Sequence, residues 1–192
     1  MPLTEEEIEH LELKEKFKDL EVEINDYIYL LNIIGSTDVK SDKLFRKHFY
    51  KFNKVKRNEK WNNYFYGIFS DIKSGKLNDF KTILEKVVSD GWNCEYTTIT
   101  KMLSVVNPNT VIIDKYTLNN FNLKMNHKLD KTIRVQWIVE LYEKLVKKMQ
   151  EFLNYQPNKD FIDAFHLCFF DTDYDDISYE MKIYFEIIFD SR

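Results

Sequence analysis

Residues 133–153, with the sequence IRVQWIVELYEKLVKKMQEFL, form the longest periodic stretch of the chain. Apolar side chains recur in it at steps of three or four residues, the spacing that places them on one face of an α-helix. The stretch predicts a long amphipathic helix and indicates a helical fold. The side chains expected to face the core are Ile133, Trp137, Leu141, Leu145, Met149 and Phe152.

The same periodicity extends through most of the chain on both sides of this stretch. Only residues 110–113, TVII, have the composition of a short strand. The chain contains only four Gly and three Pro, so few helix breakers interrupt the pattern. We therefore expect one all-α domain over residues 1–192, a compact array of roughly eight to ten helices. Further helices are predicted over residues 43–57, 61–72, 79–88, 97–106, 115–123, 158–170 and 177–189, of which 158–170 is apolar on most sides and therefore expected to be buried.

Side chains with capping preferences mark the ends of the first two helices. Thr4 and Glu7 form a capping box before the first helical stretch, which ends at Gly35, a residue type that often follows a helix. Ser41 or Asp42 can cap the helix that comes next, because both side chains can accept hydrogen bonds from the first backbone N–H groups.

The overall composition is typical of a soluble globular protein. A chain of 192 residues and 23.3 kDa can bury one substantial core, and 44% of its residues are hydrophobic and 31% charged. The first residues are acidic and do not resemble a signal peptide, and no apolar run approaches the length of a membrane span. Cys94 and Cys168 are expected to be buried, reduced thiols. These features predict a cytoplasmic protein without membrane attachment.

No sequence motif for a metal or a cofactor is present. The spacing of Cys and His residues does not resemble a zinc site. The acidic segment 171–176, DTDYDD, lacks the glycine and the glutamate of an EF-hand loop, so we expect a solvated loop. Neither a phosphate-binding loop nor a dinucleotide fingerprint occurs. We therefore expect no metal and no cofactor.

Positive charge is concentrated between residues 40 and 60. This segment has nine Lys or Arg residues and two acidic residues, a local balance of +7, which leaves −11 for the remainder of a chain whose net charge is −4. A row of cations on one side of a helix can follow the phosphates of a nucleic acid, and a solvated basic face without a partner is the alternative. The candidate nucleic-acid-binding residues in this row are Lys43, Lys47, Lys51, Lys54, Lys56 and Arg57.

Asp114 follows four apolar or neutral residues at the expected start of a helix. A carboxylate at such a position caps the helix, because it accepts hydrogen bonds from the first-turn N–H groups. The same carboxylate is also a candidate catalytic group, and the two roles are compatible. Lys101, among apolar neighbours, is expected either to be an ordinary surface lysine that points away from the core or to join the nucleic-acid-binding residues.

Residues 45–125 resemble an uncharacterised family of bacterial proteins. Two stretches carry the resemblance, FYKFNKVKRNEKWNNYFY and TTITKMLSVVNPNTVIIDKYTLNNFNLK. The matching elements are Phe49-Tyr50, Arg57-Asn58 with Trp61, Thr100-Lys101 with Leu103, Asn107-Pro108, Ile112 or Ile113 with Asp114, and Asn120 with Leu123.

The second stretch is also similar to the core of the helix-hairpin-helix DNA glycosylases. The resemblance implies a helical array of that type and aligns the catalytic aspartate of the family with Asp114. The nucleophilic lysine of the lyase-type members would fall near Glu95 and Tyr96, and Lys101 lies too close to Asp114 in sequence to match it. The resemblance therefore implies a monofunctional enzyme, in which Asp114 stabilises cationic charge on the sugar or activates water.

Two functions are consistent with these patterns. The first is nucleic-acid binding, with DNA as the partner and base excision of the glycosylase type at Asp114. The second is a non-enzymatic helical scaffold that binds a protein partner in a regulatory or defence role. The first requires the basic row and Asp114 to border one groove, which the structure can test.

Overall fold

The computed structural model describes residues 5–55, 57–126, 128–169 and 177–191, with side chains described outside 5–16, 131, 132, 168 and 169. Thr4, Lys56, the segment 171–176 and the side chain of Cys168, on which expectations rested, lie outside this description. The described residues contain nine helices and no strand, so the all-α prediction is confirmed. The helices are α1 (Glu5–Ile34), α2 (Lys43–Asn53), α3 (Glu59–Lys73), α4 (Phe80–Ser89), α5 (Tyr96–Val106), α6 (Lys115–Asn120), α7 (Lys131–Leu153), α8 (Gln156–Phe169) and α9 (Tyr179–Asp190).

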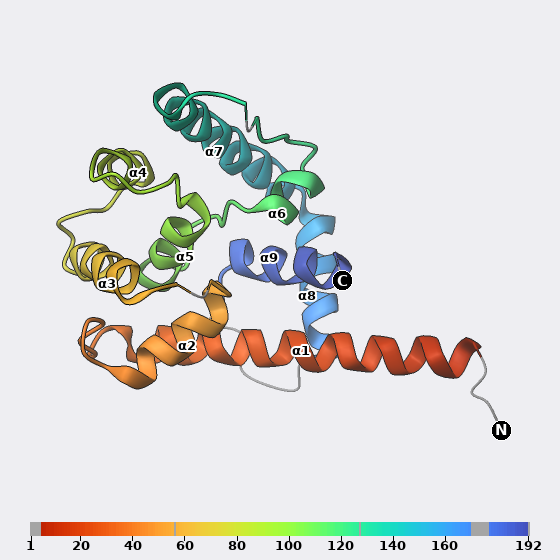
Figure 1. Ribbon diagram of the computed structural model, residues 1–192. Helices are drawn as coiled ribbons and strands as arrows, with labels where there is room; N and C mark the ends of the chain where they lie inside the picture. The colour runs from red at the N-terminus through yellow and green to blue at the C-terminus, as the bar shows by residue number, and fades with distance from the viewer. Residues whose placement is uncertain (1–4, 56, 127, 170–176, 192) are drawn as a thin grey trace.

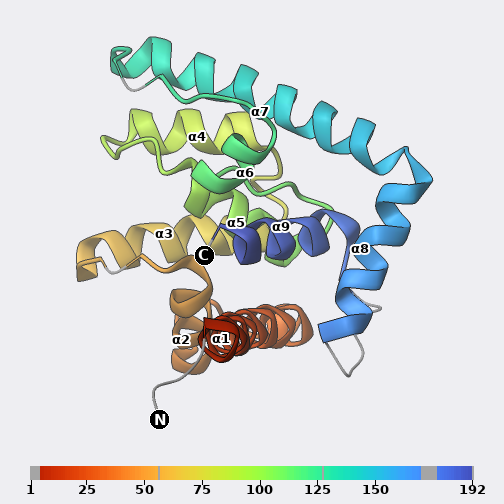
Figure 2. The ribbon, with the colours of Figure 1, turned by 90° about the vertical axis from the view of Figure 1, so that its right-hand side faces the viewer.

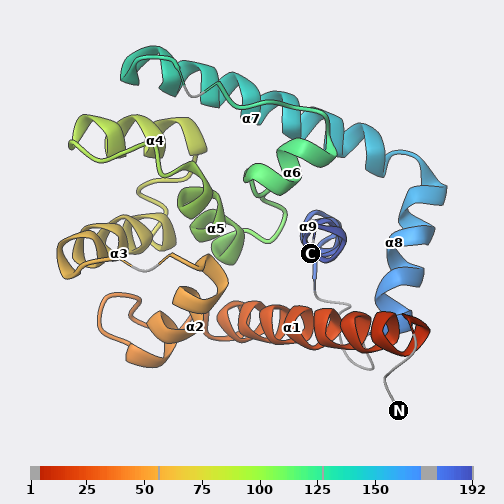
Figure 3. The ribbon, with the colours of Figure 1, turned by 45° about the vertical axis from the view of Figure 1, so that its right-hand side comes forward.

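The long helices α1 and α7 run along opposite borders of the molecule (Figures 1 and 3). Helices α5 and α9 lie between these borders, and α8 leads from the end of α7 back toward α1, as Figure 2 also shows. Helix α5 packs against α1, α3 and α4, whereas α9 packs against α1, α6 and α8. The two central helices therefore connect the parts of the domain through a shared core.

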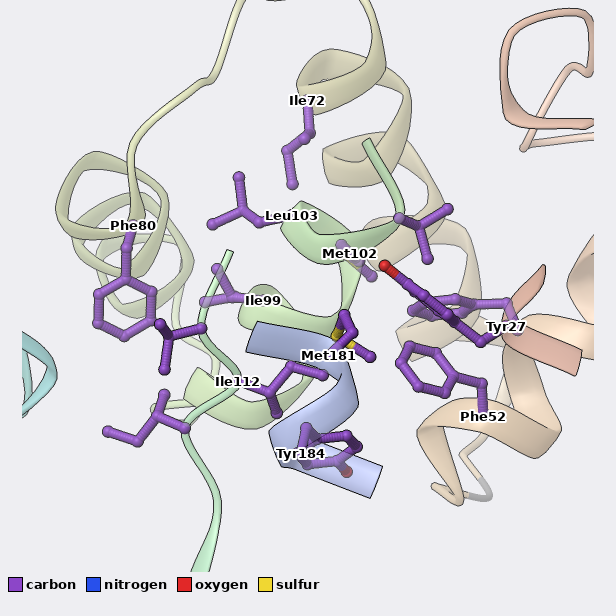
Figure 4. Packing of buried hydrophobic residues seen from close by; sticks show 14 of the residues in the cluster. Tyr27, Phe52, Ile72, Phe80, Ile99, Met102, Leu103, Ile112, Met181 and Tyr184 are labelled. Atoms are coloured by element: carbon purple, nitrogen blue, oxygen red, sulfur yellow. The ribbon is translucent and has the colours of Figure 1, made fainter. Parts of the chain in front are cut away.

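The residues from Thr98 to Val105 in α5 are all buried, because neighbouring elements cover the helix on every side. Figure 4 shows Ile99, Met102 and Leu103 of α5 among side chains from several other elements. A helix in this position has no solvent-facing side on which a charged residue could be placed. Burial of Lys101 follows from the position of α5 in the fold.

Side-chain caps fix the starts of several helices. Of the two residues expected to cap α2, Asp42 does so, accepting hydrogen bonds from the backbone N–H groups of Leu44 and Phe45. The hydroxyl of Ser41 donates instead to Asp38. The carboxylate is thus directed to the helix end, where backbone N–H groups lack partners within the helix.

Some of the predicted secondary structure is wrong, and the helix expected over 115–123 ends at Asn120. Helix α2 ends at Asn53 and not at Arg57, because Lys54 adopts a left-handed backbone conformation with φ 56° that terminates the helix. Residues 110–113 belong to no helix and form no strand, because the backbone of no described segment pairs with them. Val111, Ile112 and Ile113 are nevertheless buried, which explains why the segment is apolar.

Two predictions about which helix faces are buried are also wrong. Ile133 at the start of α7 is 55% exposed, so the core-facing stripe begins at Val135. Helix α8 was expected to be buried but lies at the periphery, where Phe161 and Leu167 are exposed by 58% and 82%. Cys94 is only half-buried. No helix in the described part of the chain is both long enough and apolar enough to cross a membrane.

Candidate functional site

A cavity of about 400 Å³ lies where the end of α2, helix α5, the start of α6 and α9 meet. Its polar lining comes from segments that are far apart in the sequence, and the turn at Asp114 is one of its walls. The lining residues that can act on a ligand through charge or hydrogen bonds include Asn53, Lys54, Lys101, Asp114, Lys115 and Tyr184.

Asp114 caps α6, as the sequence predicted, and it also faces the cavity. Its Oδ1 atom accepts hydrogen bonds from the backbone N–H groups of Tyr116 and Thr117, both at 2.9 Å. The Thr117 hydroxyl accepts from the Asp114 N–H in return, which completes a capping box. Among the described residues, Oδ2 accepts one long hydrogen bond, from the Tyr184 hydroxyl at 3.4 Å. One carboxylate oxygen therefore maintains the helix end, and the other is available to a ligand.

Lys101 is 5% exposed, so the expectation of an ordinary surface lysine is wrong. Its ammonium group donates to the backbone carbonyl of Phe52 at 2.7 Å and lies 4.8 Å and 5.6 Å from the ring centres of Phe52 and Tyr184. Burial lowers the pKa of Lys101 from its ordinary value of 10.5 to about 8, although the charges of Asp114 and Glu23 raise it. Lys101 is thus a buried cation beside the candidate catalytic carboxylate.

Asn53 is the third polar group of the cavity with an unusual environment. It follows the apolar stripe of α2, four residues after Phe49, and is 4% exposed. Its Nδ2 donates to the Thr98 hydroxyl at 3.3 Å. Its Oδ1 is buried and has no hydrogen-bond partner among the described residues. Such orphaned acceptors are uncommon in native proteins, because an unmet hydrogen bond in the interior costs free energy.

Among the described residues of the basic row, one belongs to the cavity lining. Lys54 lines the cavity, whereas Lys43, Lys47, Lys51 and Arg57 do not belong to its described lining. Lys43 and Lys47 are exposed and form no ion pair with any described residue. The structure therefore brings Lys54 into one cavity with Asp114, and it does not bring the rest of the row there.

Acidic residues offset part of this positive charge. Lys51 lies 3.5 Å from Asp26 of α1, and Lys54 pairs with Glu23 of the same helix. Arg57 lies 3.3 Å from Glu95. These ion pairs are partly exposed, so each contributes little to stability. They reduce the positive potential along the second half of the row.

Other ionisable groups near the cavity respond to the same burial. The pKa of Tyr96 is raised by burial and by the negative charge of Asp114. Among the described residues, no group of three His, Cys, Asp or Glu side chains is placed to hold a metal ion. The chemistry available in the cavity is therefore that of amine, amide, phenol and carboxylate groups.

Asn53 and Tyr184 are site residues that the sequence did not reveal as such. A signal existed for Asn53, because a polar residue four positions after Phe49 occupies a core-facing position of an amphipathic helix. Tyr184 looked like any other core residue of α9, and only the packing of α9 against α6 brings its hydroxyl to Asp114.

No protein-family model, curated protein or solved structure matches the chain.

Proposed function

We propose that the protein binds nucleic acid along α2 and admits one unpaired nucleotide into the cavity beside Asp114. The observation that carries this proposal is that Lys54, a member of the basic row at the C-terminal end of α2, lines the same cavity as Lys101 and Asp114. A volume of about 400 Å³ is within the range of small-molecule sites and is sufficient for one nucleobase. Enzymes that act on a base take it out of the stack into such a pocket.

The chemistry that we propose is hydrolytic removal of the base. The oxygen of Asp114 that does not cap the helix, Oδ2, is the group that would stabilise positive charge on the sugar or take a proton from the attacking water. The cap of α6 supports this role, because it fixes the orientation of the carboxylate through Oδ1. Lys101, by contrast, is a donor that would contact the base.

The alternative is a non-enzymatic scaffold that binds a protein partner. Two observations favour it: acidic residues pair with Lys51, Lys54 and Arg57, and the capping role alone accounts for the position of Asp114. A scaffold that binds a protein partner does not need to bind the phosphates of DNA. Salt dependence of nucleic-acid binding therefore separates the two proposals.

A binding experiment with two charge-matched variants tests the first proposal. Lys43→Glu with Lys47→Glu removes the unpaired part of the basic row, and Lys144→Glu with Lys148→Glu makes the same charge change on exposed positions of α7. Fluorescence anisotropy with labelled single-stranded and duplex DNA, measured from low to high salt, gives the affinity. We expect binding that weakens steeply with salt, a loss in the α2 variant and little change in the α7 variant.

Affinity that is independent of salt, or equal losses in the two variants, would overturn nucleic-acid binding along α2. For excision, mass spectrometry of bases released from damaged DNA compares the wild type with Asp114→Asn. We expect the variant to bind DNA and to release no base above background. Equal release by both proteins would remove Asp114 from the mechanism.

A further inference from the structure

Three residues that line the cavity carry polar groups whose hydrogen-bonding capacity is not used up by the described residues. Asn53 Oδ1 is a buried acceptor without a partner among the described residues. The ammonium group of Lys101 has three N–H groups, and its described hydrogen bond uses one. Asp114 Oδ2 is an acceptor with one long contact. One donor and two acceptors therefore belong to residues that line the same cavity.

This combination restricts the chemistry of a ligand. A phosphate or carboxylate group offers only acceptors, so it could satisfy Lys101 but would be repelled by Asn53 Oδ1 and Asp114. A simple cation would be repelled by Lys101. A neutral group that carries both an acceptor and a donor meets all of these atoms, and burial makes each unmet hydrogen bond costly.

We propose that Lys101 and Asn53 form a recognition pair for a planar heterocycle with a carbonyl group beside a ring N–H, the lactam edge of uracil- or guanine-type bases. Lys101 donates to the carbonyl oxygen, and Asn53 Oδ1 accepts the ring N–H. This inference rests on the proposed function, because it specifies which class of base the cavity selects.

A carbonyl oxygen is a better acceptor for the hydrogen bond from Lys101 than a ring nitrogen is. A carbonyl oxygen has two lone pairs, so it can accept from a charged donor over a wider range of directions than a ring nitrogen with one lone pair. The rings of Phe52 and Tyr184 beside Lys101 stabilise its positive charge, which keeps the group in its donating form. Asp114 Oδ2 remains available for a second donor, such as an exocyclic amino group.

Ligand variants provide a test that needs no change to the protein. Titration of the full chain, labelled with ¹⁵N, with guanosine, uridine, 1-methylguanosine, 3-methyluridine and adenosine can be followed through the side-chain amide signal of Asn53. Methylation removes the ring N–H and leaves the carbonyl. We expect guanosine or uridine to shift the Asn53 signal, and the matching methylated nucleoside to bind about tenfold more weakly or worse.

Equal binding of methylated and unmethylated nucleosides, equal binding of adenosine, or no binding of guanosine or uridine would overturn the inference. Neither Asn53→Leu nor Asn53→Asp has this amide signal, so calorimetry measures their affinities. Asn53→Leu should abolish the preference for the unmethylated form, whereas Asn53→Asp, which retains an acceptor, should preserve it. Salt-dependent DNA binding without a lactam preference would overturn only this inference. A lactam preference without DNA binding would support the recognition pair and overturn the proposed binding of nucleic acid.

Discussion

Lys101 of α5 and Asp114 at the start of α6 line one cavity, and no ion pair joins them among the described residues. Lys101 is held instead by a backbone carbonyl of α2. A buried cation without a carboxylate in direct contact is destabilising, and an apolar residue of similar size is often the more stable choice. Perturbed groups of this kind are frequent at functional sites.

The first prediction concerns the pH dependence that Lys101 adds to stability. Its pKa is about 8 in the folded chain and 10.5 ordinarily, so between these values the unfolded chain binds more protons than the folded chain. Stability must therefore rise with pH in this window. We expect the free energy of unfolding of the wild type, relative to Lys101→Met, to increase by about 3 kcal/mol between pH 7 and pH 10.5.

Urea unfolding of both proteins at several pH values measures this difference. The buried tyrosines titrate in both proteins, so their effect cancels in the comparison. A constant difference across the range would show that Lys101 is as accessible to water in the folded chain as in the unfolded chain.

The second prediction separates the two roles of Asp114. Asparagine is as good a helix cap as aspartate, whereas alanine removes the cap and costs about 0.5–2 kcal/mol. We expect Asp114→Asn to retain nearly all of the wild-type stability and Asp114→Ala to lose an amount in that range. Thermal and urea unfolding measure both. If Asp114→Asn were as destabilised as Asp114→Ala, the negative charge and not the cap would be the stabilising feature.

Periodicity alone predicted the helices, because each amphipathic face must find the core. The position of Asp114 at a helix start was also predictable, since apolar residues followed by a capping side chain specify it locally. The core-facing stripe of α9, with Met181, Tyr184, Phe185 and Ile188, is buried as its spacing predicts. These features depend on short-range sequence.

The environment of Lys101 could not be predicted in this way. A helix with one apolar stripe and a helix covered on all sides can have the same spacing of apolar residues. They differ only in the residues on the side opposite that stripe. In α5 that side contains Thr98, Thr100 and Ser104, which are small enough to be buried. The fact that Lys101 is the only charged residue of α5 was a usable signal, but the partner that receives its hydrogen bond lies in α2.

The third prediction concerns Glu186 in α9. Burial, together with the charge of Asp190, raises the pKa of Glu186 to about 7. Between its ordinary value of 4.5 and pH 7 the folded chain therefore holds more protons than the unfolded chain, so stability falls as pH rises. We expect Glu186→Gln to gain stability relative to the wild type as pH rises from 4.5 to 8, measured by urea unfolding.

Asp190→Asn provides the matched control for Glu186. It removes the neighbouring charge, which is the smaller cause of the raised pKa, and leaves Glu186 in place. The pH dependence should become shallower and should not disappear. A wild-type curve parallel to that of Glu186→Gln would contradict the burial of this carboxyl group.

The fourth prediction tests the peripheral position of α8 with two residues of that helix. Ile162 is 0% exposed, and Leu167 is 82% exposed. Truncation of a buried isoleucine to alanine removes apolar contacts and leaves a cavity, so Ile162→Ala should cost about 2–5 kcal/mol. Leu167→Ala deletes a side chain that is already in water and should change the free energy of unfolding by less than about 0.5 kcal/mol. Urea unfolding of the two variants measures the contrast. Equal losses of unfolding free energy would show that both faces of α8 are buried, as its apolar composition had predicted.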